Sequence, residues 1–189
     1  MDPLISKELI QLAEKDLQVR EKLLEEDQLS GAYHPEMEQI HKQNAKRLRE
    51  IIRDIGFPTV SKVGAEASDA AWLIIQHSIG EPAFMKECYT MMLENQNDIS
   101  RSNIAYLYDR IQVFQSKPQR YGTQLTTGGV PYPVENKTLL NEKRSQAELP
   151  LLSQTVISNI ADIEKIPEID RQDKDYNVWR IKTGWLSDL

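Results

Sequence analysis

The sequence feature that most constrains the fold is an apolar run at residues 70–75, Ala-Ala-Trp-Leu-Ile-Ile, inside a segment with helical boundaries. Ser68 is a suitable N-terminal cap, and Gly80 followed by Pro82 ends the segment. A surface helix shows one apolar stripe, whereas this run is apolar on nearly every side of a helix. We therefore predict a central helix over residues 68–79, with the rest of the chain arranged around it.

The central helix ends in two polar side chains, Gln76 and His77. At about 100° per residue, His77 falls on the face of Leu73 and Ile74, and Gln76 falls on the opposite side. A polar pair at the end of a core helix makes both residues candidates for a functional site.

The remaining pattern predicts a mainly α-helical fold. Apolar residues recur at helical spacing in five further segments, at residues 6–26, 35–55, 82–95, 100–115 and 138–149. Alternation around residues 119–134, with a glycine pair at the turn, predicts a small β-ribbon. A chain of 189 residues suits one domain. We predict a single helical domain of five or six helices over residues 1–150, and a C-terminal extension over residues 151–189.

Polar residues interrupt the apolar stripes of the first two helices. Asp16 lies on the first stripe, where Arg20, four residues later, is within reach of an ion pair. His41 and Asn44 lie at core-like positions of the second stripe. Two interpretations remain open for each position: a satisfied structural group, or a ligand-binding side chain.

Composition excludes several classes of function. The net charge of −6 and the pI of about 5.2 argue against a nucleic-acid-binding or membrane-binding surface. No apolar run has the length of a membrane span, and no secretion signal is visible at the start, so we expect a cytoplasmic protein. The single cysteine, Cys88, lies on an apolar stripe and is interpreted as a buried, inert thiol.

Three motifs resemble a bacterial domain family of unknown function. They are Ala70-Ala-Trp-Leu-Ile-Ile-Gln-His77, the pair Asp109-Arg110, and Gln119-Arg-Tyr-Gly-Thr-Gln124. The resemblance covers roughly residues 9–150, and it names no substrate. It implies that ten residues belong to one pattern: Asp16, Arg20, Asn44, Gln76, His77, Asp109, Arg110, Gln119, Tyr121 and Gln124.

The chemistry best matched to this pattern is acid/base catalysis. Histidine is the side chain best suited to proton transfer near neutral pH, so His77 is the candidate acid or base, oriented by Asp109 or Asp16. Arginine pairs well with carboxylate or phosphate, which predicts a small anionic substrate. The residues assigned to substrate binding are Arg20, Asn44, Gln76, Arg110, Gln119, Tyr121 and Gln124.

Two other interpretations stay open. The protein binds a ligand or a protein partner without turnover, with Trp179 and Trp185 in the tail at residues 176–189 as a docking segment. Alternatively, the polar residues form a structural network that ties the ribbon to the helices.

The sequence identifies no cofactor and no metal site. His34, His41 and His77 lack a recognised ligand spacing. The segment at residues 126–129 lacks the lysine of a phosphate-binding loop, and no Gly-x-Ser-x-Gly motif occurs.

Overall fold

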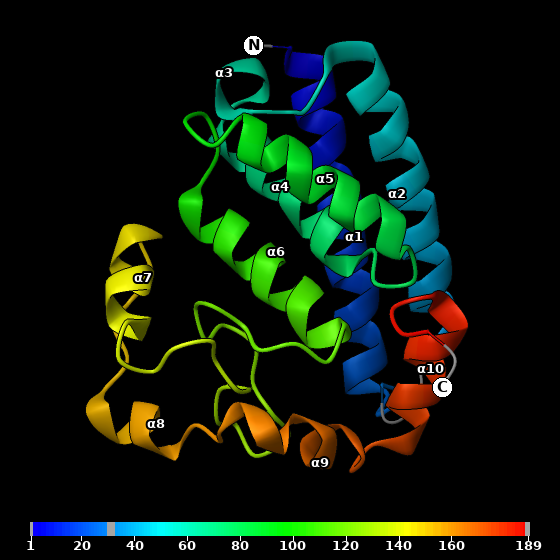
Figure 1. Ribbon diagram of the computed structural model, residues 1–189. Helices are drawn as coiled ribbons and strands as arrows, with labels where there is room; N and C mark the ends of the chain where they lie inside the picture. The colour runs from blue at the N-terminus through cyan, green and yellow to red at the C-terminus, as the bar shows by residue number, and fades with distance from the viewer. Residues whose placement is uncertain (1, 30–32, 188–189) are drawn as a thin grey trace. The chain divides into compact units, whose positions relative to one another are not determined.

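The computed structural model describes residues 2–29 and 33–187, and the chain divides into two compact units, Met1–Ser100 and Arg101–Leu189. Both units are built from helices (Figure 1). The mainly α-helical class is therefore confirmed. The predicted number of five or six helices was too low, because the described residues contain ten α-helices and one 3-10 helix, several of them only one or two turns long.

The first unit surrounds the central helix. Its elements are α1 (Pro3–Glu25), α2 (Pro35–Ile55), α3 (Val60–Val63), α4 (Ala65–His77) and α5 (Pro82–Glu94). Helix α4 contacts each of the other four, and α5 crosses in front of it in Figure 1. Ala71, Ile74 and Ile75 of α4 are buried. The apolar run thus lies in the core of this unit, as its composition predicts.

The start of α4 differs from the prediction. The helix begins at Ala65, directly after Gly64, whose φ of +86° lies in the left-handed region that favours glycine. Ser68, the predicted cap, is buried in the first turns of the helix. The backbone bend at Gly64 therefore sets the start of the helix, and no side-chain cap is needed there.

The second unit contains shorter elements. They are α6 (Arg101–Phe114), α7 (Leu140–Gln146), α8 (Gln154–Asn159), a 3-10 helix (Ile163–Lys165), α9 (Ile166–Asp170) and α10 (Lys174–Thr183). A core cluster of Val134, Leu140, Ile157 and Ile160 joins α7 and α8 to the segment that follows α6.

The predicted β-ribbon is reduced to isolated bridges. Tyr132 N–H donates to the carbonyl of Gln124 at 2.9 Å, and an antiparallel bridge joins Leu125 and Pro131. None of the described residues forms a continuous strand. Pro131 and Pro133 explain the difference, because proline has no N–H to donate to a ladder. We call residues 119–134 the ribbon loop.

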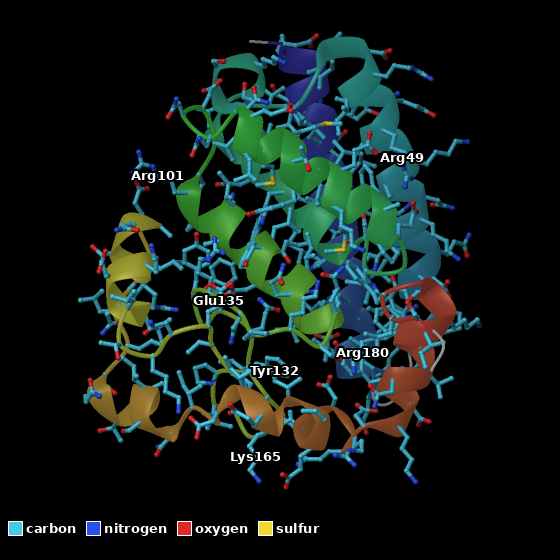
Figure 2. The ribbon with its side chains drawn as sticks, in the orientation of Figure 1. Arg49, Arg101, Tyr132, Glu135, Lys165 and Arg180 are labelled. Atoms are coloured by element: carbon cyan, nitrogen blue, oxygen red, sulfur yellow. The ribbon has the colours of Figure 1, made fainter. Side chains whose placement is uncertain are left out.

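The segment at residues 151–189, predicted as an extension, is built into the second unit. Trp185 is 4% exposed, and its ring lies 4.7 Å from that of Phe114. Arg180, on α10, is fully buried and donates to Asp170 at 3.0 Å and to the carbonyl of Val113 at 3.2 Å (Figure 2). One of the two predicted docking tryptophans therefore packs inside its own unit.

None of the described helices combines the length and the apolar character that a bilayer crossing requires.

The Arg180–Asp170 pair supplies a test of this unit. We expect Arg180→Ala to lower the free energy of unfolding by about 3–5 kcal/mol, because it leaves Asp170 without its buried cation. Urea denaturation followed by circular dichroism measures the change. Lys182→Ala is the matched control on the exposed side of α10 and should stay within about 0.5 kcal/mol of wild type. Equal effects of the two variants would contradict this role of Arg180.

Candidate functional site

The candidate site is centred on a buried carboxylate. Asp16 lies on the same face of α1 as Leu9, Ala13 and Leu23, which belong to the core. Its side chain is 1% exposed. A carboxylate in such a position needs partners, because burying an unpaired charge is costly.

Two histidines from other helices supply those partners. His77 is the last residue of α4, and its Nδ1 lies 3.0 Å and 3.1 Å from the two oxygens of Asp16. His41, on α2, places Nε2 3.3 Å from Asp16 Oδ2. The two rings lie 5.2 Å apart, centre to centre. Three helices of the first unit thus meet at one carboxylate.

The two histidines lower the pKa of Asp16. Burial alone would raise the pKa of this carboxyl, but the hydrogen bonding and charge interactions of His41 and His77 outweigh burial and lower the pKa to about 2. Asp16 is therefore ionised at neutral pH and can only accept hydrogen bonds.

The ionised carboxylate determines the tautomer of His77. His77 must carry hydrogen on Nδ1, because that atom forms a hydrogen bond with an acceptor, whereas the 3.3 Å contact favours a hydrogen on Nε2 of His41. In neutral His77 the lone pair then lies on Nε2, at the opposite edge of the ring. The His77 side chain is 20% exposed, against 9% for His41, so His77 is the member of the cluster that reaches solvent.

Tyr33 extends the cluster behind His41. Its hydroxyl forms a hydrogen bond with His41 Nδ1, and the two rings stack 5.6 Å apart. Burial raises the pKa of Tyr33, so the phenol keeps its proton and donates it to His41. Nδ1 of His41 is thereby hydrogen-bonded, and Nε2 makes the 3.3 Å contact with Asp16.

Three predicted binding residues lie near this cluster in sequence or on the same helices. Asn44 is buried one turn beyond His41 and donates to the carbonyl of Leu12 at 3.2 Å, which ties α2 to α1. Gln76 is buried beside His77. Arg20 is exposed, one turn beyond Asp16 on α1. The predicted pair of Arg20 with Asp16 is replaced by the two histidines.

Asp109 has a different role, in the second unit. Its carboxylate is fully buried and accepts hydrogen bonds from the backbone N–H groups of Arg120, Tyr121 and Thr123 at 2.8–3.2 Å, and from the Thr123 hydroxyl. Burial raises the pKa of Asp109 to about 6, although these hydrogen bonds oppose the shift. This geometry favours a structural role for Asp109, which holds the ribbon loop on α6.

Other predicted residues of the second unit lie in the ribbon loop or on α6. Gln119 is fully buried, and its amide donates to the carbonyls of Gln124 and Tyr132 at 2.9 Å and 2.7 Å. Tyr121 packs on a small apolar cluster around Ala105. Arg110 lies on α6, where burial lowers its pKa.

The second unit also contains a cleft of about 1140 Å³, lined by residues that include Tyr132, Asp170 and Tyr176. None of the predicted site residues lines it. Cys88 in the first unit is buried, and burial raises the pKa of its thiol, which opposes a nucleophilic role.

Residues 3–163 match a protein family described as "Family of unknown function (DUF6624)". The match covers most of the chain, so the protein belongs to this family. No curated protein and no solved structure matches the chain.

The site contains two residues that the sequence did not assign to it. For His41 the sequence left open a core role or a ligand-binding role. The signal for its place in the site is that its stripe, like that of Asp16, carries a polar residue at a core position. Tyr33 gave no signal, because it lies in the connection between two helices.

The depressed pKa of Asp16 gives a pH prediction. A carboxylate with a lowered pKa stabilises the fold above its unfolded pKa of 3.8, and this contribution is lost as pH falls to about 2. We expect the stability difference between wild type and Asp16→Asn to shrink by roughly 2–3 kcal/mol across that window. Urea denaturation between pH 5 and pH 2 measures it. A difference that stays constant over this range would show that the histidines do not hold Asp16 ionised.

Proposed function

We propose that the protein is an enzyme that uses His77 as a general acid/base on a small anionic substrate. The observation that carries the proposal concerns the partly exposed side chain of His77. Its Nδ1 pairs with the buried Asp16 carboxylate at 3.0 Å. This pairing leaves Nε2 to exchange a proton with a bound molecule.

Asp16 supports proton transfer in two ways. It holds the imidazole in one tautomer and one orientation, and its negative charge stabilises the positive charge that His77 acquires when it takes up a proton. The position of His77 at the C-terminal end of α4 adds to this, because the negative end of a helix dipole favours a cation.

The substrate class is inferred from charge. Arg20 stands exposed one helical turn from Asp16, and a guanidinium pairs readily with a carboxylate or phosphate. An anion held by Arg20 would lie on the side of α1 that carries the cluster. We also propose that the protein acts in the bacterial cytoplasm.

The second candidate function is ligand or protein binding without turnover. The observation that favours it is the full engagement of Asp16, His41 and Tyr33 by one another, because such a network also serves as a structural support. The exposed residues of the tail, Val178 among them, are the corresponding surface for a protein partner.

The test compares wild type with His77→Gln on a mixture of bacterial metabolites. We expect mass spectrometry to find at least one anionic metabolite that wild type converts, with conversion about 10²–10⁴-fold slower for the variant. Arg20→Gln should raise KM for that metabolite, and Lys22→Gln, an exposed control on the same helix, should leave KM unchanged.

Two results would contradict the proposal. One is equal conversion by wild type and His77→Gln. The other is an absence of conversion together with a metabolite that raises the melting temperature of both proteins, which would identify a binding protein whose ligand does not depend on His77.

A further inference from the structure

We propose that Asp16, His41 and His77 together form a binding site for a divalent transition-metal ion such as Zn²⁺. Each side chain offers one ligand atom, and these atoms all lie within 4.8 Å of one another. Among the described residues, they form a group of two imidazoles and one carboxylate held by three different helices. The inference goes beyond the proposed function and does not rest on it.

The distances between the ligand atoms suit a metal centre. Zinc lies about 2.0–2.1 Å from imidazole nitrogen and carboxylate oxygen, so two ligands of a tetrahedral centre are roughly 3.4 Å apart. The observed separations from Asp16 Oδ2 are 3.1 Å to His77 Nδ1 and 3.3 Å to His41 Nε2. An ion could therefore enter with small side-chain shifts.

The donor set selects the kind of metal. Imidazole nitrogen suits zinc, copper, iron and nickel, whereas magnesium and calcium prefer all-oxygen sites. Two neutral histidines and one carboxylate carry a single negative charge, so a bound divalent ion leaves the centre with a net positive charge. Such a centre attracts an anion.

A hydrogen bond from Tyr33 supports the second histidine. Metal-bound histidines usually hydrogen-bond through their other ring nitrogen, which fixes the ring in place. Tyr33 contacts His41 Nδ1 in this way. On metal binding the proton of His41 moves to Nδ1, and the Tyr33 hydroxyl rotates from donor to acceptor, as a hydroxyl can do without moving its oxygen.

The unequal exposure of the three ligands leaves one side of the centre open. Asp16 and His41 are 1% and 9% exposed, whereas His77 is 20% exposed. Three protein ligands with an accessible fourth position are the arrangement of catalytic rather than structural zinc sites. The open position would be filled by water or by the anion itself.

Metal binding and the proposed base chemistry require different tautomers of His77. A metal ion takes the lone pair of Nδ1, so the proton resides on Nε2 and the ring no longer accepts a proton there. His41 distinguishes the two forms, because the metal site needs it as a ligand and the Asp16–His77 pair does not.

The test is metal titration of protein stripped with EDTA. We expect calorimetry to show one equivalent of Zn²⁺ bound per chain, and Co²⁺ to give the visible absorption of a low-coordinate site. His41→Gln should weaken Zn²⁺ binding by at least about 100-fold and abolish the Co²⁺ band. His34→Gln is the matched control, since His34 caps α2 and is not a member of the cluster, and it should bind as wild type does.

Tyr33→Phe provides a second variant in case His41→Gln fails to fold, as judged by circular dichroism. It keeps all three ligands and should weaken Zn²⁺ binding by about 10–100-fold. The proposal is overturned if stripped wild type binds no stoichiometric metal. It is also overturned if His41→Gln, once shown to be folded, or Tyr33→Phe binds as tightly as wild type. Metabolite conversion by EDTA-treated protein tests the proposed function independently of metal binding.

Discussion

The packing of the first unit depends on partners for one buried negative charge, the carboxylate of Asp16. Asp16 lies on the core face of α1, and its burial would be unfavourable without the two histidines beside it. Because His41 and His77 come from α2 and α4, the interaction also fixes how these helices meet α1. The same contact that satisfies the carboxylate orients His77, so stability and the proposed chemistry share one group of atoms.

The second unit accommodates its own buried carboxylate in a different way. Asp109 accepts hydrogen bonds from backbone N–H groups and from a threonine hydroxyl of the ribbon loop. Such donors cannot exchange protons near neutral pH, which suits a structural role. Asp16 is instead paired with imidazole groups, a kind of side chain that serves as acid or base in catalysis. Of the two carboxylates, Asp16 is therefore the one that the proposed function uses.

Sequence reasoning recovered the features that depend on local pattern. The bounds of α2, the core position of residues 70–75 and the polar end of α4 follow from helical periodicity and from proline and glycine positions. Local sequence rules could not identify the partners of Asp16. The i,i+4 rule pointed to Arg20, whereas the actual partners lie on other helices and are brought in by tertiary packing.

For Asp109 the sequence left two roles open, orientation of His77 or support of the ribbon. The path of the ribbon loop, which residue types alone do not give, favours the second role. The prediction of a continuous ribbon was wrong because prolines lack the backbone N–H groups that a β-ladder needs.

The central claim is that an ionised Asp16 accepts a hydrogen bond from His77 Nδ1 and contacts His41 Nε2, and so favours one tautomer of each ring. Nitrogen NMR of histidine side chains in the ¹⁵N-labelled, metal-free protein tests this most directly, with Asp16→Asn to assign the affected signals. Above the pH at which the rings become neutral, the account predicts that His77 carries its proton on Nδ1 and His41 on Nε2. A neutral His77 with its proton on Nε2, or rings that exchange freely between tautomers, would contradict it.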